Sequence, residues 1–213
     1  MNNPIQKIYE FHHSVEREDG FSIMKKQRGE LLQKFIGTGK IVLDVGCRDG
    51  ALTQFFSEGN NVLGVDIDKK SLIKAKEKLG IETIHMDLND DWSVLENRKF
   101  DIIFAGEVLE HVYYPRDMIK KIKEHLNDGG IFIGSVPNAF SLKNRIRYLF
   151  GQKRNTPLDD PIHITQFSMS ELRQILSSEF KNLDIIGIGR YKKLSKIFPN
   201  LISFILFFIA KNE

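Results

Sequence analysis

Two glutamates and a histidine lie close together in the segment from Glu107 to His111. On a helical turn, positions i, i+3 and i+4 share one face, so Glu107, Glu110 and His111 are expected to converge. Because an unperturbed imidazole titrates near neutral pH, His111 is the best candidate for a general base toward an oxygen nucleophile, and the more distant His163 could complete the site. The same four side chains also suit Mg²⁺, Mn²⁺ or Zn²⁺. A third alternative is that Glu110 and His111 only pack against their neighbours.

A glycine-containing turn runs from Asp44 to Gly50. Its glycines, Gly46 and Gly50, allow the backbone to turn sharply and to approach a ligand closely. Asp66 ends the next apolar run, 22 residues after Asp44, and its carboxylate could accept hydrogen bonds from both hydroxyls of a ribose. The pattern therefore indicates a nucleoside-binding turn, and the alternative is a tight turn followed by a surface aspartate.

The type of nucleoside follows from the residues inside that turn. The dinucleotide fingerprint G-x-G-x-x-G is not met, because Arg48 stands where the second glycine would allow a pyrophosphate to approach. Asp44 also disfavours a nearby phosphate and favours a cationic group. S-adenosylmethionine carries a sulfonium, an amino group and a ribose but no phosphate, so these residues favour it over NAD. His12 and His13 could cover such a pocket or remain solvated.

The elements that must position these residues alternate between strands and helices. Short apolar runs predict strands at 41–45, 61–67, 81–86, 100–105, 131–136, 183–189 and 203–210. Helical spacing predicts helices at 22–36, 51–58, 70–79, 115–126 and 141–150, a turn covers 127–130, and Ser168 with Glu171 forms a capping-box pattern. This alternation predicts an α/β fold with a mostly parallel sheet that has helices on both faces.

Length and composition fit one domain spanning 1–213, with 41% hydrophobic residues and a less regular insertion at 137–167. They exclude a disordered chain, a collagen and a repeat array. Cys47 is the single cysteine, which agrees with a reducing, cytoplasmic location. The apolar run at 201–210 is about half the ~20 residues that a membrane span needs. It therefore reads as a strand buried on both faces, and no transmembrane span is expected.

Five motifs in order resemble the successive motifs of class I S-adenosylmethionine-dependent methyltransferases. They are VLDVGCRDG (42–50), VLGVDID (62–68), MDL (86–88), FDIIFAGEVLEHV (100–112) and LNDGG (126–130). The resemblance implies a Rossmann-like, doubly wound sheet of seven strands that is mostly parallel and has an antiparallel last strand. It also implies S-adenosylmethionine as the cofactor. Arg48 departs from the family, which usually has glycine at this position.

The resemblance assigns the cofactor contacts residue by residue. Asp66 would bind the ribose hydroxyls, Asp87 would accept the adenine amino group, and Arg28 would either pair with the methionine carboxylate or be a solvated charge. The full set of implied cofactor-binding residues is Arg28, Asp44, Gly46, Cys47, Gly50, Asp66, Ile67, Asp87, Leu88, Ala105 and Gly106. The string Glu-Val-Leu-Glu-His resembles that of metal-using quinone-pathway O-methyltransferases and of small-RNA terminal 2′-O-methyltransferases, although it also occurs in methyltransferases without a metal.

The charge distribution bears on the methyl acceptor. Residues 1–140 have a net charge of −3, residues 141–200 have +6, and the whole chain has +3. The basic helix at 141–150 and the basic residues at 190–196 could be solvated, could cover an anionic acceptor, or could face an anionic membrane. The region 137–167 resembles the lid of methyltransferases from surface-glycan and lipid-linked sugar pathways.

We therefore expect O-methylation of a small molecule or a glycan- or lipid-linked metabolite. The alternatives are RNA 2′-O-methylation, with or without a metal, and a binding module without turnover, whereas a protein acceptor and the oligomeric state stay open.

Overall fold

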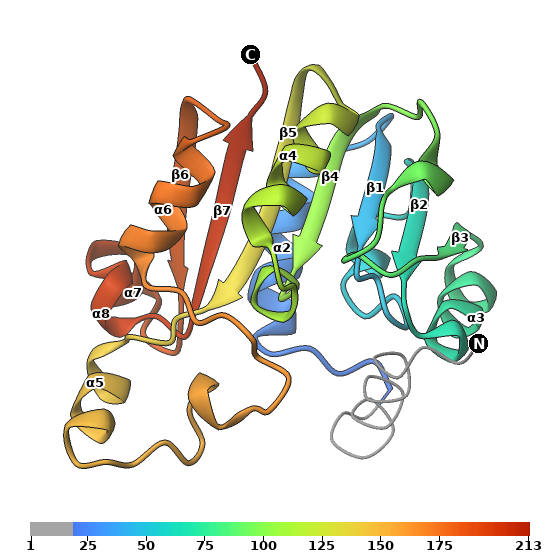
Figure 1. Cartoon of the computed structure of the whole chain (residues 1–213). Coiled ribbons are helices and arrows are strands. Elements are labelled where there is room, and N and C mark those ends of the chain that lie inside the picture. Colours follow the sequence, from blue (N-terminus) through green and yellow to red (C-terminus); the bar gives the residue numbers. More distant parts are fainter. Residues whose placement is uncertain (1–18) are drawn as a thin grey trace. The chain divides into compact units, whose positions relative to one another are not determined.

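The structure is a computed structural model, and it describes residues 19–213 (Figure 1). Seven strands form one sheet in the order β3-β2-β1-β4-β5-β7-β6. This order, with helices between the strands, confirms the predicted Rossmann-like, mostly parallel fold. The chain divides after Phe104, within β4, into two compact units. Each unit is described by itself below.

The first unit holds a parallel part of the sheet. Its elements are α2 (Lys25–Ile36), β1 (Ile41–Val45), β2 (Asn61–Asp66), α3 (Lys69–Leu79), β3 (Glu82–His85) and the first residues of β4 (Phe100–Gly106). In the parallel register, Asp44 pairs with Gly64 and Asp66 pairs with His85. The carboxyl ends of β1 and β2 therefore lie at one edge, where functional loops of such sheets gather.

Local sequence explains where helix α3 begins and ends. Asp68 is the N-cap of α3, and its Oδ1 accepts from the backbone N–H groups of Lys70 at 2.9 Å and Ser71 at 3.3 Å. Gly80 ends the helix with φ at +67°, a left-handed conformation that glycine adopts without a steric penalty. These caps fix the loop between Asp66 and α3.

The second unit contains the antiparallel part of the sheet. Its elements are α4 (Pro115–His125), β5 (Leu126–Pro137), α5 (Leu142–Leu149), α6 (Met169–Ser177), β6 (Asn182–Ile188), α7 (Lys192–Ile197), α8 (Pro199–Ile202) and β7 (Ile205–Lys211). Strand β7 runs antiparallel to both β5 and β6 and lies between them. Its residues 205–210 are all buried, which confirms the prediction of a strand covered on both faces.

Aromatic side chains fill the core of the second unit. The Phe132 ring packs edge-on against the Phe208 ring, with 4.9 Å between centroids. The Phe180 ring is tilted relative to the Phe132 ring, and their centroids are 6.0 Å apart. Such pairs add about 0.5–1.5 kcal/mol each beyond the apolar area that they bury. Within residues 19–213, no helix is both long enough and apolar enough to cross a bilayer.

Three local predictions were wrong or incomplete. The predicted helix at 51–58 is only a 3-10 turn, Thr53–Phe55, which lies between the positive-φ glycines Gly50 and Gly59. The predicted turn at 127–130 is part of β5, since Asn212 extends the ladder by donating its backbone N–H to Gly130 O at 2.8 Å. The short helices α7 and α8 were not predicted.

Candidate functional site

Asp44 lies at the carboxyl end of β1 and is only 2% exposed. Thr53 donates its hydroxyl to Asp44 Oδ2 at 2.6 Å. Burial raises the pKa of Asp44 to about 7, and the negative charge of Asp66 adds to this, whereas the Thr53 hydrogen bond and the positive charge of Arg28 lower it. The unit therefore holds a carboxyl group that a bound cation would ionise.

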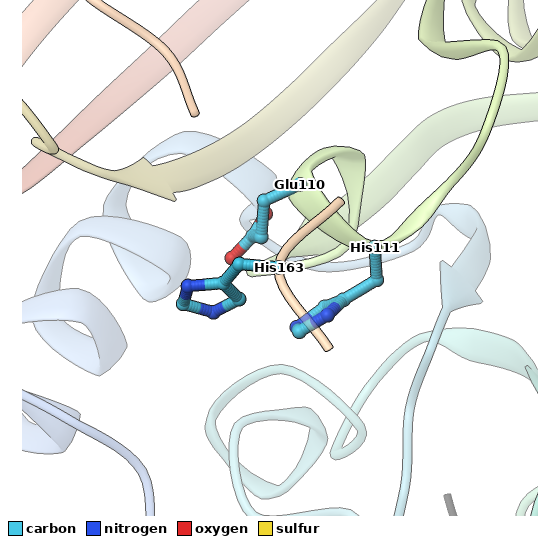
Figure 2. Close-up of side chains that lie close together, drawn as sticks. All are labelled: Glu110, His111 and His163. Atoms are coloured by element: carbon cyan, nitrogen blue, oxygen red, sulfur yellow. The ribbon is translucent and has the colours of Figure 1, made fainter. Parts of the chain in front are cut away.

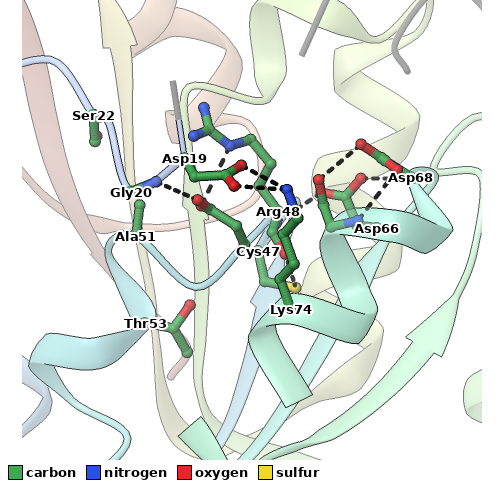
Figure 3. A network of polar contacts seen from close by, with 12 residues as sticks. Asp19, Gly20, Ser22, Cys47, Arg48, Ala51, Thr53, Asp66, Asp68 and Lys74 are labelled. Carbon is green, nitrogen blue, oxygen red and sulfur yellow. Dashed lines mark hydrogen bonds and ion pairs between the residues drawn. The ribbon is translucent and has the colours of Figure 1, made fainter. Parts of the chain in front are cut away.

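Asp66, at the end of β2, is held by two backbone groups (Figure 3). Its Oδ2 accepts from the N–H of Arg48 at 2.9 Å, and its Oδ1 accepts from the N–H of Asp68 at 2.9 Å. These two hydrogen bonds orient the carboxylate beside the turn. This arrangement fits the predicted ribose contact.

Arg48 occupies the glycine position of the motif in a conformation that glycine would adopt easily. Its φ is +50°, and its Nε lies 3.3 Å from Asp49 Oδ1. Asp49 also accepts the backbone N–H of Gly20. Although burial raises the pKa of Asp49, that hydrogen bond and the charge of Arg48 lower it below its usual range. The turn therefore contains an arginine in a left-handed conformation, and an ion pair with Asp49 holds its side chain.

Glycine is needed at the end of this turn, and the cysteine in its middle is buried. Gly50 has φ at +76°, and a Cβ there would lie 2.5 Å from Leu79 Cδ1. Cys47 Sγ fills the space above Gly64, where a Cβ would come within 2.7 Å of the sulfur. Burial raises the pKa of the Cys47 thiol well above its usual value, which disfavours the reactive thiolate form.

Arg28 is a buried cation of the first unit. It is 1% exposed, and its Nη1 donates to Ser22 Oγ at 3.0 Å. The alternative of a solvated surface charge is therefore wrong. A buried guanidinium near Asp44 suits the carboxylate end of an amino-acid group.

The remaining predicted cofactor residues lie on loops after β2 and β3 and at the end of β4. Asp87 Oδ1 accepts the backbone N–H of Asn89 at 3.0 Å, and Leu88 O accepts from Trp92 Nε1 at 3.3 Å. His85 Nε2 donates to Ile67 O at 3.0 Å. Three further positions are Gly46, which follows β1 and donates its backbone N–H to Val65 O at 2.8 Å, and Ala105 and Gly106 of β4, of which Ala105 is buried. Their contacts with a cofactor stay predictions.

A second cluster lies in the second unit and joins Glu110, His111 and His163 (Figure 2). One potential ligand atom from each residue lies within 4.8 Å of the other two. Glu110 is buried, and the two imidazole rings lie 4.8 Å apart between centroids. Side chains 52 residues apart in the chain are thereby brought into one group of donors that suits a divalent cation or a shared proton.

Backbone carbonyls determine the tautomer of both histidines. His111 Nδ1 lies 2.9 Å from Ile162 O, and His163 Nδ1 lies 2.9 Å from Pro157 O. A carbonyl can only accept, so each Nδ1 donates its proton to the carbonyl, and Nε2 is the nitrogen that can ligate a metal or exchange a proton. His163 Nε2 also lies 3.6 Å from Asp160 Oδ2, so a cation at that nitrogen would meet a carboxylate.

Glu107 was predicted to converge with Glu110 and His111, but it does not join their group of ligand atoms. It has φ at +62°, and its Oε1 accepts the hydroxyl of Ser135 on β5 at 2.9 Å. The residues that follow form a 3-10 turn, Leu109–His111, instead of the α-helical turn on which the prediction rested. A catalytic role for Glu107 stays a prediction.

Sequence reasoning missed several supporting side chains. Thr53 and Ser135 bind the carboxylates of Asp44 and Glu107, and no local pattern signals either pairing. Asp160 stands three residues before His163, a spacing that could have indicated the pair. His12 and His13 lie outside the described residues.

The chain resembles known proteins in both sequence and fold. A family model described as a methyltransferase domain matches residues 17–180. The chain belongs to this methyltransferase family. The prediction of a class I S-adenosylmethionine-dependent methyltransferase is thereby confirmed at the level of family and fold, and S-adenosylmethionine is the cofactor that the family uses.

Individual relatives agree with this assignment. A "Probable S-adenosylmethionine-dependent methyltransferase" of Mycolicibacterium smegmatis is 25% identical over 153 residues, which cover 70% of this chain and 55% of that protein. A ubiquinone biosynthesis O-methyltransferase of Actinobacillus pleuropneumoniae is 34% identical over 109 residues, 47% of each chain. The chain thus spans about half the length of these curated relatives. A crystal structure of a SAM-dependent methyltransferase from Archaeoglobus fulgidus shares the fold with a TM-score of 0.68 at 16% identity, over 96% of this chain and 99% of that one.

Proposed function

We propose that this methyltransferase transfers a methyl group from S-adenosylmethionine to an oxygen atom of a small molecule or of a glycan- or lipid-linked metabolite. The observation that carries the choice of oxygen is the cluster of Glu110, His111 and His163, with ligand atoms within 4.8 Å. A hydroxyl must lose its proton during methylation, and this cluster offers acceptors for that proton. The O-methyltransferase among the relatives agrees with the proposal.

The first unit supplies the binding of the cofactor. When bound, S-adenosylmethionine supplies a methyl group on a sulfonium, whose sulfur retains the bonding electron pair as the methyl leaves. Asp44 balances a positive group of the ligand, Asp66 accepts from the ribose hydroxyls, and Arg28 pairs with the carboxylate. Each role matches the burial and charge of the residue described above.

The second unit supplies the acid–base chemistry. His111 Nε2 takes the proton from the acceptor hydroxyl, while Nδ1 remains hydrogen-bonded to Ile162 O. The carboxylate of Glu110 stabilises the imidazolium that results. The same three residues would hold a divalent cation if one binds, and the cation would then lower the pKa of the acceptor hydroxyl. Histidine ligands with Nδ1 bonded to a backbone carbonyl are typical of metal sites, so the fit is good.

The acceptor side is assigned to residues 137–167, as the sequence predicted. Contacts within the second unit support this assignment, because the segment binds two members of the Glu110, His111 and His163 cluster and contributes the third. Ile162 O accepts from His111 Nδ1 at 2.9 Å, and the Thr165 N–H donates to Glu110 O at 3.0 Å.

RNA 2′-O-methylation is the second candidate function. The observation that favours it is the basic character of α5 and α7 together with a cluster that suits a metal. Exposed aliphatic side chains among those basic residues are less typical of a surface that binds phosphates and stacks bases.

The test combines calorimetry with an acceptor screen. S-adenosylmethionine binding is measured first, and no binding would leave only the non-catalytic module. Hydroxyl-bearing acceptors are then screened for release of S-adenosylhomocysteine, with RNA as a separate arm. For a confirmed acceptor, we expect His111→Ala to lower turnover by about 10²- to 10⁴-fold while cofactor affinity is retained. His125→Ala, on α4, is the matched control, and a fully active His111→Ala protein would refute the proposal.

Chelation separates the two uses of the cluster. If it holds a metal, dialysis against EDTA abolishes turnover, and Mg²⁺, Mn²⁺ or Zn²⁺ restores it. If His111 acts alone as the base, turnover survives dialysis and falls only when His111 is replaced.

A further inference from the structure

Two segments of the second unit form a strongly basic surface. Residues 141–154 contain five Lys and Arg, residues 190–204 contain four, and neither segment contains an Asp or Glu. The basic residues are Lys143, Arg145, Arg147, Lys153, Arg154, Arg190, Lys192, Lys193 and Lys196. All of them are exposed except Arg147, which is half-buried. The proposed reaction uses none of these charges.

Large apolar side chains stand exposed among these charges. On α5 and just after it, Leu149 is 81% exposed and Phe150 is 71% exposed. On and beside α7, Ile197 is 66% exposed and Tyr191 is 62% exposed. Ser195 is the only buried residue of α7, a helix of six residues. These side chains are too numerous and too close together to count as isolated surface apolar residues.

The two segments belong to one surface of the second unit. Arg145 on α5 donates from Nη2 to Asn200 Oδ1 on α8 at 3.4 Å. Lys143 Nζ lies 5.8 Å from the centre of the Phe204 ring. Asn138, just after β5, donates from Nδ2 to Asn200 O and Ser203 O, each at 3.1 Å. Figure 1 shows α5, α7 and α8 at the same end of β6 and β7. Below, this surface of residues 141–154 and 190–204 is called the basic apolar face.

We propose that the basic apolar face docks on the surface of an anionic lipid bilayer. Lys and Arg near an anionic bilayer are attracted to its headgroups, while aliphatic and aromatic side chains between them insert at the boundary of the acyl chains. The long lysine side chains can remain at the headgroups because their stems extend along apolar surface. The face has both kinds of group at adjacent positions, as in Lys196 and Ile197.

Two other occupants fit the face less well. A second copy of the chain in a symmetric contact would place this all-positive surface against itself, which costs free energy. A nucleic acid would match the charge, and the exposed rings of Phe150 and Tyr191 could stack on its bases. The exposed aliphatic side chains, Leu149, Leu194 and Ile197, would gain little from it, because they cannot stack as aromatic rings do. A bilayer matches the charge and the aliphatic side chains together.

This docking goes beyond the proposed function and does not depend on the acceptor. It would hold for a water-soluble acceptor, and it would place the enzyme beside its substrate if the acceptor is lipid-linked. Vesicle binding is measured without acceptor or turnover. A failure of docking therefore leaves the methyl-transfer test unaffected, and the reverse is also true.

The experiment is co-sedimentation of the full chain with vesicles. We expect binding to vesicles that contain phosphatidylglycerol and phosphatidylcholine, much weaker binding to pure phosphatidylcholine, and loss of most binding at high salt. Each basic residue at an anionic surface contributes about fivefold to partitioning, so Lys192→Gln, Lys193→Gln and Lys196→Gln together should lower it roughly a hundredfold. The matched control neutralises Lys34, Lys76 and Lys78, three exposed lysines of the first unit, and should change little.

A second pair of variants tests the apolar part. Ile197→Ser with Phe198→Ser should weaken binding to anionic vesicles even at low salt, whereas Ile73→Ser, an exposed isoleucine on α3, should not. Circular dichroism and affinity for S-adenosylhomocysteine check that each variant is folded. Equal binding of wild type and the triple variant would overturn the proposal. So would binding to single-stranded RNA without binding to vesicles, or self-association that the apolar variants abolish.

Discussion

The affinity for S-adenosylmethionine should depend on pH through one buried carboxyl group. Asp44 has a pKa of about 7 in the cofactor-free structure because it is buried. A cationic ligand binds the ionised form, so binding below pH 7 must first release a proton. About 90% of Asp44 is ionised at pH 8 and about 10% at pH 6. We therefore expect the apparent Kd to rise about tenfold between pH 8 and pH 6.

Isothermal titration calorimetry can measure both the affinity and the number of protons released on binding. Titrations at pH 7 in two buffers of different ionisation enthalpy should report about half a proton released for each cofactor bound. Asp44→Asn is the control, because it keeps the shape and removes the charge. It should bind more weakly at pH 8 and lose the pH dependence. A Kd that is constant from pH 6 to pH 8 in the wild type would refute the reasoning, as would an equal slope in the variant.

The same carboxyl group also affects the stability of the cofactor-free protein, which should fall as the pH rises, whereas cofactor affinity should increase. The pKa of Asp44 is raised from 3.8 when the chain folds, so the folded state binds the proton more tightly than the unfolded state does. That contribution is fully present below pH 3.8 and is lost as the pH rises to about 7. Asp44→Asn should therefore raise the free energy of unfolding of the cofactor-free protein at pH 8, by up to about 4 kcal/mol. Thermal denaturation at pH 8 checks the sign.

Three further substitutions test the structure. Asp66→Asn should weaken cofactor binding by about 10- to 100-fold in calorimetry, because a charged acceptor of hydroxyl groups is lost, and unchanged affinity would contradict the ribose assignment. Ser168→Ala removes the capping box of α6 and should cost about 1 kcal/mol in urea denaturation. The capping box also lowers the pKa of Glu171, so the stability that this residue adds is present at neutral pH and is lost as the pH falls through its folded pKa. Gly64→Ala should destabilise by about 1–3 kcal/mol, since its Cβ would lie 2.7 Å from Cys47 Sγ. Combining it with Cys47→Ala should restore part of that loss; a strictly additive double mutant would count against the packing argument.

The parts of the fold that could be predicted are those that local chemistry decides. The strands are β-branched and apolar runs, Gly37 and Gly80 stop helices, and Ser168 with Glu171 forms the predicted cap. The turn from Asp44 to Gly50 could also be predicted, because its glycines directly follow β1. Asp66 ends β2, and the parallel register brings the ends of the two strands to the same edge.

What could not be predicted depends on contacts between distant segments. The burial of Arg28 follows from packing against residues before α2, including Ser22, and its sequence neighbours suggest exposure. Thr53 turns toward Asp44, and only a short 3-10 turn forms there. Glu107 is bound by Ser135, 28 residues away, so helical spacing alone misplaced it. His163 lies beside His111 because the irregular segment before α6 returns to the loop that follows β4.

The position of β7 affects how the second unit is made on the ribosome. Strand β6 ends at Ile188, and its partner β7 ends 23 residues later at Lys211, yet β7 separates β6 from β5 in the sheet. At about 5–20 residues per second, β6 waits roughly 1–5 s for the strand that joins it to β5, and β5, which ends at Pro137, has waited longer. During that interval their unpaired edges are templates for pairing with other nascent chains. The last strand therefore makes translation speed and chaperone access, as well as sequence, determinants of the yield of native protein.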